Sequence, residues 1–310
     1  MGRIAFVFPG QGAQYTGMGQ DFYENFDRAK EVFAIANKVS GMSMEELIFQ
    51  ENEKLDITKY TQIAMLTVEL AILKVIEERG ITSSVNAGLS LGEYAALTAS
   101  GGLSVHDALS LIVKRGAIMQ EAVPTGGAMT AVLGLANDVI ESICEKTKGI
   151  VSVANYNCPG QTVISGEENA VNKAIVALQE AGAKRCIQLN VSGPFHSKML
   201  EKAGDKLEEE LRRVVIGDIT TPYVSNVTAD YVTDRQEVKG LLKTQISSSV
   251  RWQQSVELMV RNGVDTFIEI GPKKTLTGFL KKIAPRITGY HVETIEDLDK
   301  LSEVLKVGQE

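Results

Sequence analysis

A serine flanked by two glycines is the sharpest chemical signal in the sequence. Gly88-Leu-Ser-Leu-Gly92 is a G-x-S-x-G pattern that follows a short apolar run and precedes a segment with helical periodicity. In that context the pattern predicts a nucleophile elbow, a turn too tight for side chains at the glycine positions. The elbow exposes the serine hydroxyl at a helix N-terminus, where free N–H groups can stabilise an oxyanion. We therefore expect Ser90 to be a nucleophile, with a glycine-flanked helix cap as the alternative.

A serine nucleophile requires a general base, and the chain has three histidines. His106 is expected in the exposed first turn of a helix, and His291 lies in an apolar segment where a structural role is equally expected. His196 lies between a predicted strand and a predicted helix, and such loops build the sites of α/β sheets. We select His196. No neighbouring acidic residue is evident, so the sequence predicts a Ser–His dyad whose imidazole is oriented by a backbone carbonyl.

Arg115 is predicted to be a buried cation. Apolar residues lie three, four and seven positions away, which puts Arg115 on the apolar face of its helix and Lys114 in water. A buried guanidinium is costly unless it is paired. Two partners remain open at this point: a carboxylate of the protein, or a substrate carboxylate held by a bidentate pair of hydrogen bonds.

Strands and helices alternate around these residues, which predicts an α/β fold with a mostly parallel sheet flanked by helices. The expected strands are 4–8, 84–89, 222–226 and 266–270, and the helices around them include 21–37, 60–78, 105–122, 197–213, 236–248 and 253–262. Between them, the order β-α-β-β-α-β indicates an inserted ferredoxin-like α+β subdomain. We expect residues 1–124 and 192–310 to form the larger, catalytic domain and residues 125–191 to form the smaller one.

The composition excludes several classes of protein. Among 310 residues, 32 Lys and Arg stand against 39 Asp and Glu, a net charge of −7 that argues against nucleic-acid binding. Three cysteines without a C-x-x-C pair, and only three histidines, predict neither a disulfide framework nor a metal site. No apolar run approaches the ~18 residues of a membrane span, and no secretory signal is evident. We expect a cytoplasmic protein that uses no metal.

Five segments together resemble the malonyl-CoA:acyl carrier protein transacylases of fatty acid synthesis, over Ile4 to Ile283. They are Phe8-Pro-Gly-Gln-Gly-Ala-Gln14, Gly88-Leu-Ser-Leu-Gly-Glu-Tyr94, Asn155-Tyr-Asn-Cys-Pro-Gly-Gln161, Gly193-Pro-Phe-His196 and Glu269-Ile-Gly-Pro272. The resemblance implies a hydrolase-like α/β domain with a ferredoxin-like insertion. It also implies transfer of a malonyl group from malonyl-CoA to the pantetheine thiol of acyl carrier protein through a malonyl-serine. The CoA thioester and the pantetheine arm are then substrates, and no cofactor is implied.

The resemblance also implies roles for individual residues. Ser90 would be acylated with His196 as its base, and the backbone N–H groups of Gln11 and Leu91 would form the oxyanion hole. Arg115 would bind the free malonyl carboxylate, which favours the second of its two alternatives.

Further positions would contact the substrate or the histidine. Asn155, Asn157 and Phe195 would be substrate-binding, and Phe195 resembles members that select malonyl over methylmalonyl units. The backbone carbonyl of Gln245 would orient the histidine. Leu89 stands where the family commonly carries a histidine that is not the base, so activity is expected to survive.

Other functions compatible with the same residues are a discrete acyltransferase of a polyketide synthase and an acyl hydrolase or thioesterase that uses water as acceptor. A non-catalytic module that binds carrier protein would lack Ser90 or His196, and both are present. Since the family's carrier proteins are acidic, like this chain, docking would need a local positive patch. The candidates are Lys184 and Arg185, or Lys273, Lys274, Lys281, Lys282 and Arg286, each of which is otherwise ordinary solvated charge.

Overall fold

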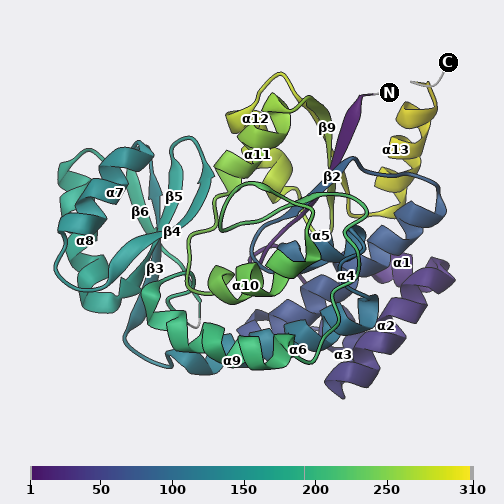
Figure 1. Cartoon of the computed structure of the whole chain (residues 1–310), viewed down its shortest axis with the longest axis horizontal. Helices are drawn as coiled ribbons and strands as arrows, with labels where there is room; N and C mark the ends of the chain where they lie inside the picture. The colour runs from purple at the N-terminus through teal and green to yellow at the C-terminus, as the bar shows by residue number, and fades with distance from the viewer. Residues whose placement is uncertain (1, 192, 308–310) are drawn as a thin grey trace.

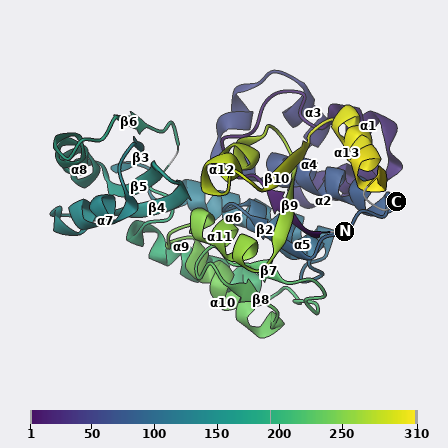
Figure 2. The same cartoon turned by 90° about the horizontal axis from the view of Figure 1, so that it is seen from above.

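Two separate sheets organise the chain (Figure 1). The computed structural model describes residues 2–191 and 193–307; Met1, Ser192 and residues 308–310, expected to belong to the larger domain, lie outside them. A six-stranded sheet is built from both ends of the chain and a four-stranded sheet from its middle. In Figure 2 the four-stranded sheet and its two helices stand to one side of the larger sheet.

The larger sheet has the strand order β10-β9-β1-β2-β7-β8. Its strands are β1 (Arg3–Phe8), β2 (Val85–Gly88), β7 (Tyr223–Val224), β8 (Tyr231–Val232), β9 (Val264–Ile270) and β10 (Thr288–Val292). The pairs from β10 to β7 are parallel, and only β8 pairs antiparallel, at the edge. The mostly parallel α/β sheet predicted from the sequence is therefore confirmed, with β8 and β10 as strands that the sequence did not predict.

Helices cover both faces of this sheet. They are α1 (Gln20–Asn25), α2 (Asp27–Ser40), α3 (Met44–Phe49), α4 (Thr58–Glu78), α5 (Gly92–Ala99), α6 (Val105–Ala122), α9 (Glu201–Leu211), α10 (Arg235–Gln245), α11 (Trp252–Arg261), α12 (Thr275–Ile283) and α13 (Ile295–Val307), with 3₁₀ turns η1 (Glu53–Asp56) and η2 (Lys198–Leu200). Helix α4 is buried along most of its length, as expected for a helix that is apolar nearly all round. It packs against α6, which carries Arg115.

Three expected helices have different bounds. The single helix expected over 21–37 is wrong, because Phe26 adopts an extended conformation (φ −128°, ψ 125°) and separates α1 from α2. The helix expected over 197–213 begins later, at Glu201, after the turn η2. The helix expected to end at residue 248 ends at Gln245, which frees the following carbonyl groups for other partners.

The smaller sheet has the order β4-β5-β3-β6, with all pairs antiparallel. Its elements are β3 (Gly127–Leu133), α7 (Asn137–Lys146), β4 (Val151–Cys158), β5 (Gln161–Glu167), α8 (Glu168–Glu180) and β6 (Arg185–Gln188), in the expected order β-α-β-β-α-β. Strand β4 also contacts the segment before α11. Val250 donates its backbone N–H to Ala154 and accepts that of Tyr156, at 2.8 and 2.9 Å. This contact holds the end of β4 beside the larger sheet.

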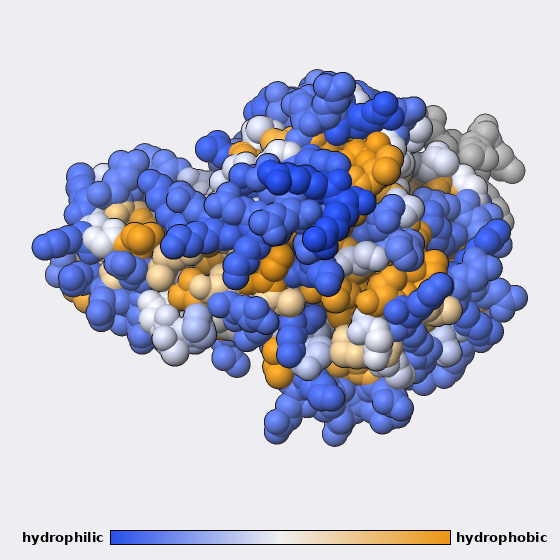
Figure 3. Space-filling model, turned by 60° about the horizontal axis from the view of Figure 1, so that its bottom comes forward, coloured by the Kyte–Doolittle hydropathy of each residue, from blue (hydrophilic) through white to orange (hydrophobic). Residues whose placement is uncertain are grey.

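Polar side chains dominate the face shown in Figure 3, with apolar side chains gathered along its hollows. No helix in the described part of the chain is both long enough and apolar enough to cross a membrane.

Candidate active site

The turn between β2 and α5 holds Ser90 in a left-handed conformation, with φ 57°. The glycines on either side are required by space. A Cβ on Gly88 would lie 1.9 Å from the carbonyl oxygen of Gly92, and one on Gly92 would lie 2.3 Å from the carbonyl oxygen of Phe8. Because Ser90 is left-handed, α5 begins only at Gly92 rather than at the serine. The sequence pattern therefore forms the predicted strand–turn–helix elbow.

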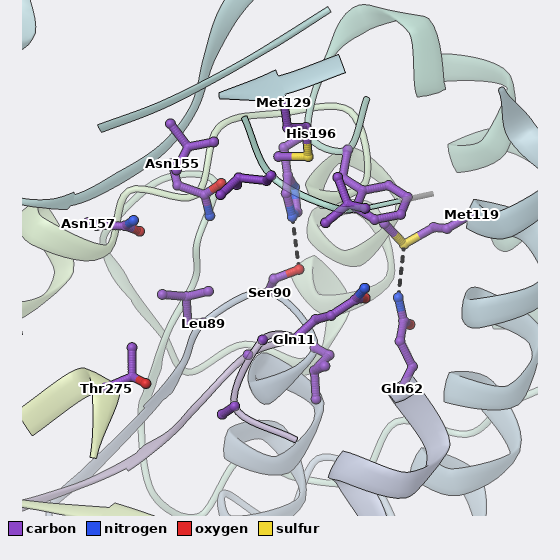
Figure 4. Close-up of a pocket in the computed structure, with 18 of the residues that line it drawn as sticks. Gln11, Gln62, Leu89, Ser90, Met119, Met129, Asn155, Asn157, His196 and Thr275 are labelled. Atoms are coloured by element: carbon purple, nitrogen blue, oxygen red, sulfur yellow. Dashed lines mark hydrogen bonds between the residues drawn. The ribbon is translucent and has the colours of Figure 1, made fainter. Parts of the chain in front are cut away.

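Ser90 and His196 are in direct contact, with 2.8 Å between Oγ and Nε2 (Figure 4). The other ring nitrogen, Nδ1, lies 2.9 Å from the carbonyl oxygen of Gln245 and 3.2 Å from that of Ser248. Carbonyl oxygens only accept hydrogen bonds, so Nδ1 carries the proton and Nε2 accepts from the serine hydroxyl. The arrangement is the expected one: a dyad oriented by backbone carbonyls, one of them that of Gln245.

His196 is held in its neutral form. Burial, followed by the charge of Arg115, lowers the pKa of its imidazole to about 4. The ring is only 4% exposed, and its own backbone N–H donates to the carbonyl of Ile246 at 3.1 Å. At neutral pH the imidazole is therefore free to take a proton from Ser90.

Arg115 is fully buried, as its helical position predicts. Its guanidinium donates to Gln62 Oε1 at 2.8 Å, to Ser90 Oγ at 3.0 Å and to Gln245 Oε1 at 3.0 Å. All three acceptors are uncharged, and Nε has no hydrogen-bond partner among the described residues. Among the described residues, Arg115 therefore makes no hydrogen bond to a protein carboxylate, which was the first of its two expected partners. Burial lowers the pKa of this guanidinium from its usual value.

A polar network behind the elbow was not predicted from the sequence. Asn226 accepts the Ser90 N–H at 2.7 Å and donates to the Gly88 carbonyl at 2.7 Å. Gln245 donates through Nε2 to the Ser90 carbonyl at 2.9 Å and to the Glu93 carboxyl at 2.6 Å. Burial raises the pKa of Glu93 to about 7. Two features of the sequence could have indicated this network: Asn226 follows a strand of a parallel sheet, and Gln62 is a polar residue within an otherwise apolar helix.

A cavity of about 230 Å³ opens in front of Ser90. It is lined by the predicted site residues Gln11, Ser90, Leu91, Arg115, Asn155, Asn157, Phe195 and His196. In Figure 4, Leu89, Asn155, Asn157 and Thr275 lie on one side of Ser90, and Gln62 and Met119 lie on the other. Because Gln62 is also hydrogen-bonded to Arg115, the buried cation marks that second end of the cavity.

The two residues expected to supply an oxyanion hole both line the cavity. Gln11 follows β1 and Leu91 follows Ser90. Among the hydrogen bonds of the described residues, neither N–H has an acceptor, whereas that of Ser90 is taken by Asn226. The Gln11 side chain is anchored by donating to Thr58 Oγ1 at 3.1 Å.

The structure separates the remaining candidates from Ser90. The side chain of His106 is 61% exposed beside Asp107, and His291 lies in β10 with Nε2 at 3.7 Å from Asp297. The candidate docking residues are all exposed: Lys184, Arg185, Lys273, Lys274, Lys281, Lys282 and Arg286. Helix α12 itself lines the cavity through Thr275, Leu276 and Phe279. The candidates on and beside this helix, from Lys273 to Arg286, therefore adjoin the opening.

Within residues 2–191 and 193–307 no group of three or more His, Cys, Asp or Glu side chains is placed to hold a metal ion. Cys144, Cys158 and Cys186 are unpaired.

The acyl transferase domain family matches residues 5–295. The malonyl CoA-acyl carrier protein transacylase of Bacillus subtilis (strain 168) is 43% identical over 99% of this chain and 98% of its own length. The crystal structure of MCAT from Streptococcus pneumoniae superposes with a TM-score of 0.94 at 47% identity, covering 97% of this chain and 99% of that one. A malonyl-transacylase in complex with its type II polyketide synthase acyl-carrier protein has a TM-score of 0.94 at 38% identity, with 97% and 99% covered. The chain therefore belongs to the acyl transferase family, among the malonyl CoA-acyl carrier protein transacylases.

Proposed function

We propose that this protein transfers a malonyl group from malonyl-CoA to the pantetheine thiol of acyl carrier protein, for fatty acid synthesis. The single observation that carries the choice of acyl group is Arg115, a fully buried cation whose hydrogen bonds to described residues go to neutral oxygens, one of them Oγ of Ser90. A buried charge without a hydrogen-bonded carboxylate favours a ligand that brings one. The free carboxylate of a malonyl thioester is such a ligand.

In the first half-reaction Ser90 attacks the thioester carbonyl. The bond from Oγ to the carbonyl carbon forms while the hydroxyl proton passes to His196 Nε2, 2.8 Å away. The N–H groups of Gln11 and Leu91 would stabilise the tetrahedral oxyanion. The carbon–sulfur bond then breaks, and the imidazolium returns its proton to the departing CoA sulfur.

The second half-reaction reverses these steps with a different thiol. His196 takes the proton of the carrier protein's pantetheine thiol, whose sulfur attacks the malonyl-serine carbonyl. Collapse of the second oxyanion releases Ser90 Oγ, which regains its proton from the imidazolium. CoA leaves the site before the pantetheine thiol of the carrier protein attacks the malonyl-serine there. The proposed transfer is therefore ping-pong, and it uses no cofactor.

The two ends of the cavity suit the two parts of the substrate. Arg115 and Gln62 would hold the malonyl carboxylate at the buried end, where Phe195 would limit the space for a substituent at the α-carbon. Asn155 and Asn157 would contact the thioester arm on the other side of Ser90. Leu89, in place of the family's usual histidine, would leave an apolar contact for that arm.

We also infer the division of the chain and its setting. Residues 1–124 and 192–310 would form a hydrolase-like catalytic domain, and residues 125–191 a ferredoxin-like subdomain, in keeping with the order of its elements. The unpaired cysteines are consistent with a reducing, cytoplasmic compartment. The exposed cations Lys273, Lys274, Lys281, Lys282 and Arg286, beside the opening, would attract an acidic carrier protein.

Mass spectrometry of the enzyme after incubation with malonyl-CoA tests the mechanism. We expect a malonyl adduct on Ser90 that disappears when a holo carrier protein is added, with formation of malonyl-carrier protein. Carrier-dependent loss of the adduct distinguishes a transferase from a hydrolase. A hydrolase would lose the adduct to water at the same rate with and without carrier protein. An active enzyme without an adduct on Ser90 would exclude the mechanism.

A second candidate is a malonyltransferase that serves a polyketide synthase. It is favoured by the relative in complex with a type II polyketide synthase carrier protein, whose chain is 38% identical. The ratio of kcat/KM for fatty-acid and polyketide carrier proteins, measured with the same malonyl-CoA, discriminates between the two pathways.

A further inference from the structure

Side chains hold both backbone polar groups of the nucleophile. Ser90 has φ 57°, in the left-handed region that residues other than glycine rarely adopt. Its N–H donates to Asn226 Oδ1 at 2.7 Å, and its carbonyl accepts from Gln245 Nε2 at 2.9 Å. Strained conformations persist where the surroundings over-determine them. The elbow is therefore held by specific contacts from a distant part of the chain, besides its two glycines.

Asn226 spans the elbow with one carboxamide. While Oδ1 accepts the Ser90 N–H, Nδ2 donates to the carbonyl oxygen of Gly88 at 2.7 Å. These two bonds join the end of β2 to the nucleophile across the turn. A side chain must both accept and donate in this geometry, which asparagine does and an ionised aspartate or a leucine does not.

The backbone of Asn226 is itself fixed. The residue is 1% exposed and follows β7, the strand that pairs with β2. Its N–H donates to Glu93 Oε2 at 3.3 Å, and its carbonyl accepts the N–H of Arg251 at 3.0 Å. The carboxamide therefore approaches the elbow from a rigid base, as a side chain that sets the position of another group must.

Two consequences for the reaction follow from this contact. Oγ stays 2.8 Å from Nε2 of His196, a geometry that proton transfer requires. The Ser90 N–H is also occupied, so it points away from the cavity and the oxyanion is left to Gln11 and Leu91. A serine that relaxed toward an ordinary conformation would lose both features.

We propose that Asn226 is a positioning residue that holds Ser90 in its reactive conformation. The inference rests on the proposed acyl transfer for its substrate, but the contact concerns any acylation of Ser90. Loss of the carboxamide slows acylation itself, with little effect on the binding of malonyl-CoA, because Asn226 is not among the residues that line the cavity.

The test compares Asn226→Leu and Asn226→Asp with a matched control, Asn86→Leu. Asn86 is another fully buried asparagine, on β2, whose side chain donates to Ser100 Oγ at 2.9 Å and accepts from Ser83 Oγ at 2.7 Å, away from the elbow. Single-turnover acylation is followed with malonyl-CoA and, separately, with a fluorophosphonate that labels reactive serines. Thermal unfolding establishes that each variant is folded.

We expect Asn226→Leu to slow acylation by both reagents on the order of 100-fold, with the KM for malonyl-CoA nearly unchanged. Asn86→Leu should remain within about threefold of the wild type. Equal losses in the two leucine variants, or an acylation rate in Asn226→Leu close to that of the wild type, would overturn the proposal.

Asn226→Asp gives a second readout, the pH dependence of its acylation rate, which would not change if Asn226 had a purely structural role. Ionised, the new carboxylate accepts the Ser90 N–H but opposes the Gly88 carbonyl; protonated, it donates to that carbonyl as the amide does. Its acylation rate relative to the wild type at the same pH should therefore rise as the pH falls. A flat ratio would overturn the proposal, including when Asn226→Leu does not fold. If the wild type reacts with the fluorophosphonate but not with malonyl-CoA, the proposed function fails while the fluorophosphonate rates still decide the role of Asn226.

Discussion

Replacing Arg115 by methionine should change the selectivity of the site more than its general reactivity. Methionine keeps much of the length of the side chain but removes the charge and the three hydrogen bonds to Gln62, Ser90 and Gln245. A malonyl carboxylate would then lie buried without a cation. An acetyl group has no carboxylate and loses no such partner.

The magnitude follows from the burial of the guanidinium. Arg115 has no exposed surface, so solvent screens its charge little. Leaving one partner of a buried ion pair without the other costs about 3–5 kcal/mol. The lost hydrogen bond to Ser90 Oγ affects malonyl and acetyl transfer alike and cancels in their ratio. At about 1.4 kcal/mol per factor of ten, the ratio of kcat/KM for malonyl-CoA over acetyl-CoA should therefore fall by about 10²–10⁴-fold.

The assay measures kcat/KM for both thioesters with one carrier protein at saturating concentration. Lys114→Met is the matched control, since Lys114 is the exposed neighbour on the same helix. Arg115→Lys should fall between the wild type and Arg115→Met, because it keeps the charge but not the planar pair of donors. If Arg115→Met lowers malonyl and acetyl transfer by the same factor, the proposed contact with the carboxylate is wrong.

Three further outcomes are expected. Because burial lowers the pKa of His196 to about 4, kcat/KM for malonyl-CoA should stay level as the pH falls from about 8 to about 5 and decline below that; a midpoint near 6.5 would contradict it. Gly92→Ala should abolish folding or acylation, because its Cβ would lie 2.3 Å from a carbonyl oxygen. Gly240→Ala is the contrasting variant, since Gly240 lies on α10 with open space around it, and it should raise stability by about 0.5–1 kcal/mol in thermal unfolding. Burial raises the pKa of Glu69 well above its usual value, so its contribution to stability is largest at low pH and is lost as the pH rises above about 4.5. The Tm of Glu69→Leu should therefore rise relative to that of the wild type between about pH 5 and pH 8. A difference in Tm that stays constant over this range would contradict the reasoning.

The positions of Ser90, Arg115 and His196 were predictable because they depend on local patterns. The two glycines around Ser90, between a predicted strand and a predicted helix, predict a tight elbow, and the clash distances at Gly88 and Gly92 confirm the steric reason for those glycines. The burial of Arg115 follows from the period of its helix, and Lys114 is exposed as that period requires. A position after a strand suggested His196 as the base.

The contacts that hold these groups were not predictable in the same way. Asn226 and Gln245 reach Ser90 from 136 and 155 positions along the chain, and no local pattern specifies which amide faces which backbone group. The break at Phe26 carries neither glycine nor proline as a signal. Strand β8 has only two residues, too few for an alternating pattern to be seen.

The charges around Ser90 explain why a carboxylate-bearing acyl group suits this site. In the structure Arg115 donates to Oγ of the nucleophile, so the same guanidinium that stabilises the serine oxygen is the group proposed to receive the substrate carboxylate. Glu93 is the nearby counter-charge, but its pKa of about 7 leaves it partly neutral, and its Oε2 already accepts from Gln245. An anionic acyl group would therefore compensate a charge that Glu93 compensates only in part. A neutral acyl group would bring no such compensation, so under the proposed mechanism discrimination would arise from the free enzyme's electrostatics as much as from the shape of its cavity.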